Sequence, residues 1–191
     1  MEHNLLVVAL GGNALLGSSQ KGTNEEQTRN AEETCEKLAC LLKPEYHLVV
    51  THGNGPQVGN IVLQNELAAP EVPPLALDSC VAESEGSMGH FLQLGMLNAL
   101  RRRGIRRYVV TSITQVVVDP NDPAFRNPTK PVGRFYTEEE AKRLIAQRSW
   151  AMVDDSKRGW RRVVPSPKPV KVIQRHMIKT QVLFGDMRTI P

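Results

Sequence analysis

The chain has 191 residues, of which 40% are hydrophobic, 23% charged and 5% aromatic, and its formal net charge is +4. This composition supports a folded core and excludes a disordered or fibrous protein. No apolar run is long enough to cross a bilayer, and the chain does not open with the pattern of a secretory signal. We therefore expect a globular cytoplasmic protein with no membrane partner.

Two apolar strands are predicted near the start of the chain, over Leu5–Leu10 and His47–Thr51, and each runs into a glycine-rich turn. The turn residues are Gly11, Gly12 and Asn13 after the first strand, and Gly53, Asn54 and Gly55 after the second. Glycine removes Cβ bulk, and a helix N-terminus offers unpaired amides, so each turn can bind an anion. Glycines also end strands for structural reasons alone, but neighbouring parallel strands would bring both turns to one edge of a sheet.

Helices are predicted between and after these strands. The first opens with a capping box formed by Thr23 and Glu26, and the second follows the turn at residues 53–55. A third, long helix is expected to be capped by Asp78 or Ser79 and ended by Gly104. This strand–helix order favours a parallel α/β sheet. A dinucleotide-binding Rossmann domain is disfavoured because no G-x-G-x-x-G follows the first strand.

Cysteines and arginines both suggest structural roles. The cysteines are Cys35, Cys40 and Cys80, an odd number without a C-x-x-C pair, so we expect packed thiols and neither a disulfide framework nor a metal site. The arginines near the end of the long helix are Arg101, Arg102, Arg103, Arg106 and Arg107. Their charge complements the helix dipole, and this interpretation is favoured over a nucleic-acid patch because aromatic side chains that could stack on bases are scarce.

The segment YVVTSITQVVVD predicts one long strand or two consecutive strands, and the amino-acid composition changes after it. The next stretch, as far as residue 169, is rich in Pro, Asp and Arg and holds one short helix with a capping box at Thr137 and Glu140. We interpret it as a lid or protrusion above the glycine turns. The segment VIQRHMIKTQVLFG is predicted to form a helix that ends at Gly185, with no strand after it.

Four motifs, in this order and spacing, resemble those of the carbamate kinases of the amino-acid-kinase superfamily. They are VVALGGNALL, THGNGPQVGN, TQVVVDPNDPAFRNPTKPVG and GWRRVVPSPKP. The resemblance runs from Leu5 to about Thr180 and implies a three-layer α/β/α sandwich with a mostly parallel sheet and a small protruding lid. It implies an acid-phosphate-binding domain at 1–119, the lid at 120–165, and a return helix and divergent tail at 166–191. The nucleotide-binding C-terminal half is expected to be absent.

The reaction implied by the resemblance is ATP + carbamate ⇌ ADP + carbamoyl phosphate, which runs toward ATP in arginine or allantoin breakdown. The family uses ATP or ADP with Mg²⁺, whose binding half is missing here, and the intact family is expected to form homodimers. Little activity is therefore expected of the chain as given. The alternatives are a non-catalytic fragment that binds carbamoyl phosphate or dimerises with an intact homologue, and a nucleic-acid binder suggested only by the basic charge.

The resemblance also implies roles for single residues. Residues 11–13 resemble the first phosphate-binding turn, and residues 53–55 resemble the turn that holds the carbamate end. Lys130 matches the lid lysine that meets the substrate, although a lysine between two prolines is ordinarily a solvated charge. Phosphoryl transfer requires positioning and neutralisation of charge, which backbone amides and an ammonium group supply. His52 is expected to pack or donate a hydrogen bond, since carbamate needs no general base.

Overall fold

The computed structural model describes residues 4–11, 15–17, 20–43, 45–172 and 181–185. Over these residues the chain is a mixed α/β protein that divides into two compact units. The first unit holds β1 (Asn4–Leu10), α1 (Asn24–Ala39), β2 (Tyr46–His52), the part of α3 (Leu77–Arg102) from Ser84 onward, β3 (Tyr108–Thr111) and β9 (Gln181–Gly185).

The second unit holds the shorter elements and the start of α3. They are α2 (Gly55–Ala68), β4 (Val116–Val118), the 3₁₀ helix η2 (Pro123–Phe125), β5 (Lys130–Tyr136), α4 (Glu138–Arg148), β6 (Met152–Asp154), β7 (Trp160–Val164) and β8 (Pro169–Val172). None of the helices in the described ranges is long and apolar enough to cross a membrane.

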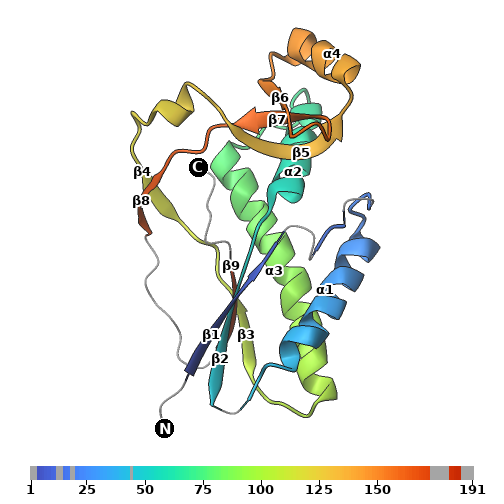
Figure 1. Cartoon of the computed structure of the whole chain (residues 1–191), viewed down its shortest axis with the longest axis vertical. Helices are drawn as coiled ribbons and strands as arrows, with labels where there is room; N and C mark the ends of the chain where they lie inside the picture. The colour runs from blue at the N-terminus through green and yellow to red at the C-terminus, as the bar shows by residue number, and fades with distance from the viewer. Residues whose placement is uncertain (1–3, 12–14, 18–19, 44, 173–180, 186–191) are drawn as a thin grey trace. The chain divides into compact units, whose positions relative to one another are not determined.

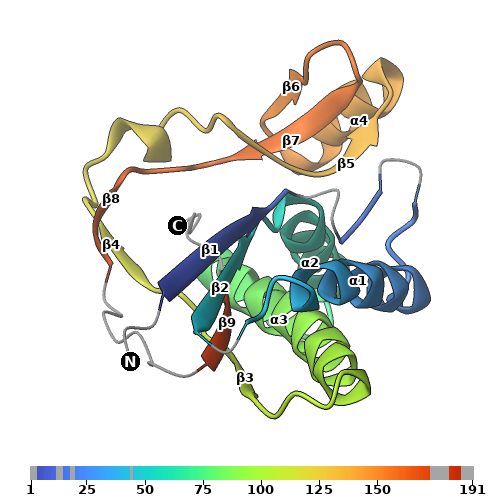
Figure 2. The same cartoon turned by 60° about the horizontal axis from the view of Figure 1, so that its bottom comes forward.

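A four-stranded parallel sheet forms the centre of the first unit. Its strand order is β1-β2-β9-β3, and every neighbouring pair runs parallel. In the register, Val7 pairs with Val49, and Val49 pairs with Leu183. The four strands lie side by side in Figures 1 and 2. The parallel sheet predicted from the strand–helix order is therefore confirmed.

Helices α1 and α3 pack on one face of this sheet (Figures 1 and 2). The core joins Cys35 and Leu38 of α1, Leu48 and Val50 of β2, and Leu92 of α3, among others. Alternation along a strand sends successive side chains to opposite faces. The partly buried residues of β1 that pack on this core are Leu6, Val8 and Leu10. Leu5 and Val7, which alternate with them, are 47% and 54% exposed.

The ends of the helices follow local signals in the sequence. Thr23 accepts a hydrogen bond from the Glu26 amide at 3.3 Å, and the Glu26 carboxylate accepts one from the Thr23 amide at 3.1 Å, as the capping box predicts. Gly104 follows the end of α3 with φ of +68°, the left-handed conformation predicted there. The predicted cap of α3 is wrong, because the helix already begins at Leu77 and Asp78 lies in its first turn.

The helix predicted at the end of the chain is wrong over the residues described there, while residues 173–180 of that prediction lie outside the described residues. Residues 181–185, expected to end a helix, form β9, which inserts between β2 and β3. Residues 169–172 form β8, which pairs with β4. Apolar residues in this tail were assigned helical spacing, but the open place between β2 and β3 supplies backbone partners on both sides of a strand. The region after residue 107 forms two strands in different units, β3 and β4.

Two of the three cysteines are packed as expected. Cys35 and Cys80 are buried, and burial raises the pKa of Cys35 to about 12. Cys40 is exposed instead, because it lies at the end of α1, and an Arg103 Nη2 group lies 3.4 Å from its sulfur. In the predicted arginine cluster, Arg102 and Arg103 pair with Glu36. These cations therefore tie α3 to α1.

The second unit is built around α2 and an antiparallel sheet of order β5-β7-β6. Val58 of α2 packs with Val132 of β5 and Val164 of β7 in a small core. Backbones approach closely here, since a Cβ added to Gly59 would lie 2.0 Å from the Cα of Gly133. Helix α4 starts at the capping box of Thr137 and Glu140, which the structure confirms.

We expect Gly59→Ala to destabilise the second unit by about 2–3 kcal/mol, because backbone atoms of β5 occupy the space of the new methyl group. Urea denaturation followed by tryptophan fluorescence measures this, since Trp150 and Trp160 both lie in that unit. Gly86→Ala, also inside a helix, is the matched control. A Cβ there meets nothing within 4 Å, so circular dichroism should show equal or higher stability. Unchanged unfolding of Gly59→Ala would contradict the close packing.

Candidate functional site

The turn after β2 begins with a glycine whose own chain leaves space around it. A Cβ added to Gly53 would meet no described atom within 4 Å, and its φ lies outside the left-handed range. Neither strain nor packing within the described chain therefore requires glycine at this position. The Gly53 amide donates to the Leu10 carbonyl at 3.3 Å, which joins the ends of β2 and β1. A ligand at this turn would have to use the following amides.

The next residue, Asn54, is held from inside the first unit. Its side chain is 2% exposed, and its Nδ2 donates to the Oγ of Ser84 in α3 at 2.8 Å. Ser84 is fully buried. No backbone hydrogen bond within the described ranges uses the amide of Asn54. The side chain of Asn54 is thus committed to the protein, while its amide has no partner among the described residues and can donate to an anion.

The buried imidazole of His52 lies at the end of β2, directly before this turn. His52 is 4% exposed, and neither ring nitrogen has a hydrogen-bond partner of good geometry among the described residues. Burial lowers the pKa of His52, and the nearby Gly53 backbone opposes that shift. The ring is therefore neutral in the folded chain and poorly suited to hold a positive charge.

A second buried contact lies at the end of β3. Glu85, 1% exposed, follows Ser84 in α3, and its Oε2 accepts a hydrogen bond from the Thr114 amide at 2.7 Å. Adjacent residues of α3 therefore hold the segments that follow two strands of one parallel sheet. Ligands of parallel α/β sheets bind beyond the carboxyl ends of the strands, which is where these segments lie.

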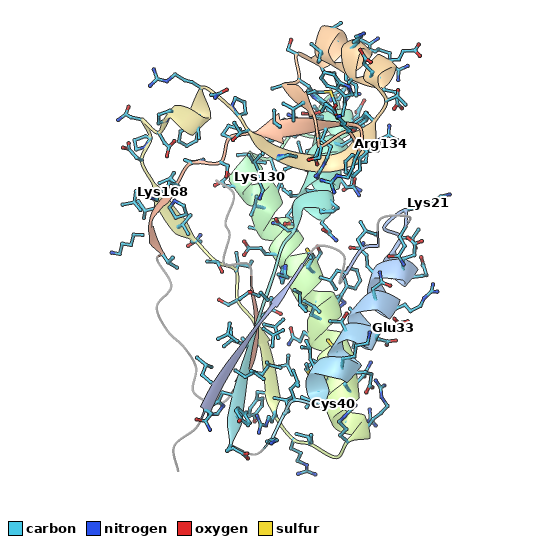
Figure 3. The ribbon with its side chains drawn as sticks, viewed as in Figure 1. Lys21, Glu33, Cys40, Lys130, Arg134 and Lys168 are labelled. Carbon is cyan, nitrogen blue, oxygen red and sulfur yellow. The ribbon has the colours of Figure 1, made fainter. Side chains whose placement is uncertain are left out.

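The other predicted site residues are placed as follows. Gly11 ends β1 and is exposed, whereas Gly12 and Asn13 lie outside the described residues. Gly55 begins α2, so the boundary between the two units falls within the second turn. Lys130 begins β5 in the second unit, as Figure 3 shows, is half-buried, and forms no ion pair within the described part of the chain.

Sequence reasoning missed Ser84 and Glu85, although their spacing carried a signal. Val81, Ser84, Glu85 and Met88 follow the i, i+3, i+4, i+7 pattern of a buried helix face. Two polar residues at positions that this pattern reserves for apolar side chains need internal hydrogen-bond partners. Those partners, Asn54 and Thr114, could not be read from the sequence.

A cavity in the first unit lies away from this site. A cavity of about 700 Å³ is lined by the end of α3 and the start of β3, including Leu97, Arg101 and Tyr108. It lies at the amino end of β3, away from the strand ends that carry the glycine turns. Within the described residues, no group of three or more His, Cys, Asp or Glu side chains could hold a metal ion.

We expect Gly53→Val to abolish anion binding at the turn while the fold persists, because the branched side chain would fill space that the described protein leaves open. Calorimetric titration with carbamoyl phosphate measures binding, and circular dichroism checks the fold. Gly86→Val makes the same change at another open position and should bind normally. Full affinity of the Gly53 variant would move the anion site elsewhere.

We expect His52 to make the chain sensitive to acid. The unfolded side chain has its ordinary pKa of about 6.5, and the folded value is lower. The unfolded state therefore binds the proton more readily, and stability falls as the pH drops from about 6.5 toward the folded-state pKa. In urea titrations, His52→Leu should weaken this pH dependence. An identical pH profile for the variant would contradict a buried neutral imidazole.

Comparison with known proteins identifies relatives along nearly the whole chain. The chain is 48% identical over 182 residues to a carbamate kinase of Pyrococcus furiosus, and the match covers 94% of this chain and 58% of the relative. The chain thus spans less than two thirds of the length of the curated relatives it matches. No family model matches the chain.

Solved structures agree with this likeness. A Giardia lamblia carbamate kinase bound to citric acid superposes with a TM-score of 0.93 at 42% identity, covering 99% of this chain and 63% of that one. The same kinase bound to AMP-PNP superposes with a TM-score of 0.78 at 41% identity, covering 97% and 61%.

Proposed function

We propose that this chain, a homologue of the carbamate kinases over 58% of the length of its Pyrococcus furiosus relative, carries the carbamoyl-phosphate-binding half of such an enzyme. The observation that carries the proposal is the turn after β2. There no described atom lies within 4 Å of a Cβ added to Gly53, and the Asn54 amide has no partner among the described residues while α3 holds the Asn54 side chain. A rigid turn with free amides suits an anionic ligand.

The proposed reaction transfers the phosphoryl group of carbamoyl phosphate to ADP. The bond between phosphorus and the carbamate oxygen breaks, an oxygen of the ADP terminal phosphate forms the new bond, and carbamate leaves. Such a transfer depends on alignment and on neutralising the phosphoryl oxygens. The amides of Asn54 and Gly55 would bind the carbamate end, and residues Gly11, Gly12 and Asn13 would bind the phosphate.

Lys130 is proposed to supply positive charge to the moving phosphoryl group. Lys130 forms no ion pair with the described residues, so its ammonium group can bind a ligand without first breaking one of the ion pairs described here. Its place on β5 holds the backbone of Lys130 in a paired strand, where it faces Val164 of β7. The flexible side chain of Lys130 then allows its ammonium group to move toward the phosphoryl group.

The remaining parts of the proposal concern a complete enzyme. We propose a three-layer α/β/α sandwich, with an acid-phosphate domain at 1–119, a lid at 120–165 and a return segment at 166–191. ATP or ADP with Mg²⁺ would bind to a further half of that enzyme, as the resemblance to carbamate kinases implies. A complete enzyme would form a homodimer and serve arginine or allantoin breakdown.

A non-catalytic role is the second candidate. The chain covers only 58–63% of its relatives, and the apolar side chains of Leu5 and Val7 on β1 are 47% and 54% exposed. Such a surface favours association with another chain. On this alternative, the polypeptide would bind carbamoyl phosphate or an intact homologue and catalyse nothing.

Calorimetric titration of the 191-residue chain with carbamoyl phosphate tests the proposed function. Saturable binding that inorganic phosphate competes for would support it, and Gly53→Val should remove the signal. No binding of either ligand would overturn the proposal. Co-purification with an intact homologue, without ligand binding, would favour the non-catalytic candidate.

A further inference from the structure

We infer that Ser84 is a positioning residue for the carbamoyl phosphate turn: it fixes the Asn54 side chain so that the Asn54 amide faces the ligand. This inference rests on the proposed function and adds to it a residue that neither touches the ligand nor belongs to a glycine turn. Both residues of the contact, Asn54 and Ser84, belong to the first unit.

The Ser84 contact is short and fully enclosed. Asn54 Nδ2 lies 2.8 Å from Ser84 Oγ, and the two residues are 2% and 0% exposed. A hydrogen bond sealed from water is costly to break, because each polar group would lose its partner without gaining a water molecule. Asn54 is therefore restricted to one side-chain orientation. This restriction matters because Gly53 before it and Gly55 after it have no side chains to hold the turn.

The place of Ser84 in α3 supports a dedicated role. It occupies a buried position between the buried apolar residues Val81 and Met88 of the same helix. An apolar residue there would satisfy packing, so the hydroxyl serves the contact with Asn54. The next residue, Glu85, accepts from the Thr114 amide at 2.7 Å. One rigid helix thus fixes the segments after β2 and β3 together, which prepares the strand ends before a ligand arrives.

Ser84→Ala in the 191-residue chain tests the inference. Carbamoyl phosphate affinity, measured by calorimetry, should fall roughly five- to tenfold, the typical loss for one hydrogen bond. Ser87→Ala is the matched control, because Ser87 lies one turn further along α3, is exposed, and bonds only to the Ser84 carbonyl at 3.1 Å. Its affinity should stay unchanged. Ser84→Cys, which keeps the shape and only a weak acceptor, should show the same loss if Ser84→Ala does not fold.

A double-mutant cycle separates positioning from general stability. Asn54→Ala and the pair Asn54→Ala/Ser84→Ala should bind equally weakly, since the inferred effect of Ser84 on the ligand passes through Asn54. Additive losses, or equal affinity of Ser84→Ala and Ser87→Ala while the unchanged chain binds, would overturn the inference and leave the proposed function intact. If the unchanged chain binds neither carbamoyl phosphate nor inorganic phosphate, the proposed function fails and this inference fails with it.

Discussion

The 191-residue polypeptide, given ADP, Mg²⁺ and carbamoyl phosphate, should form ATP no faster than the uncatalysed background. Transfer requires donor and acceptor in line with reacting atoms about 3–3.5 Å apart, an alignment that contributes roughly 7–11 kcal/mol to lowering the barrier. The chain covers 58% of the length of its Pyrococcus furiosus relative, and the part that carries ADP is proposed to lie outside that coverage. With ADP unheld, most of that contribution is missing. A coupled luminescence assay for ATP measures the rate.

A chimeric protein with the missing length restored is the control for the expected lack of ATP formation. If the unmatched part of the Pyrococcus furiosus relative follows the matched residues of this chain, turnover should appear, because both partners are then held. Light scattering on the unfused polypeptide should show association, since Leu5, Val7 and Tyr108 are 47%, 54% and 77% exposed. Rapid turnover by a monomer of the 191-residue chain would show that the described half alone aligns both partners.

Lys130→Ala in that chimera should lower kcat by about 10²–10³ and change ADP affinity much less. The reason is that the ammonium group is proposed to meet charge that develops as the phosphoryl group moves, and one such donor is typically worth this factor. Steady-state kinetics with varied ADP and carbamoyl phosphate separate kcat from the two KM values.

Lys142→Ala provides the comparison for the lysine variant. Lys142 lies in the same unit on α4, is 72% exposed and pairs with Glu138 at 2.7 Å, an exposed pair whose loss should matter little. Lys130→Arg should restore part of the turnover, since it keeps the charge and changes its shape. If Lys130→Ala and Lys142→Ala had the same kcat, Lys130 would have no role in transfer.

Local signals allowed several elements to be predicted correctly. Thr23 with Glu26 and Thr137 with Glu140 marked the starts of α1 and α4, because a capping box depends on residues three apart. Gly104 marked the end of α3, because a helix commonly ends with a glycine in the left-handed conformation. The alternation of strands and helices predicted the parallel sheet, since a crossover through a helix returns the next strand in the same direction.

Contacts between residues far apart in the chain could not be predicted from these local sequence patterns. The place of β9 between β2 and β3 depends on backbone pairing with strands far away in the chain. Its apolar residues fit a helix equally well by spacing alone. Likewise Asn54 and Ser84 are separated by 30 positions, and the local sequence around one residue does not indicate that the other is its partner.

For this protein, the sequence by itself determined the positions of the glycines after the first two strands, the capping boxes of α1 and α4, the parallel order of the first elements and the likeness to carbamate kinases. Only the tertiary structure decided that Gly53 faces open space, that Gly59 meets Gly133 backbone to backbone, and that Ser84 holds Asn54. The reason is physical. Caps and turns are stabilised by residues within one helical turn of each other, whereas open space, close approach and buried hydrogen bonds exist only after folding joins separate segments.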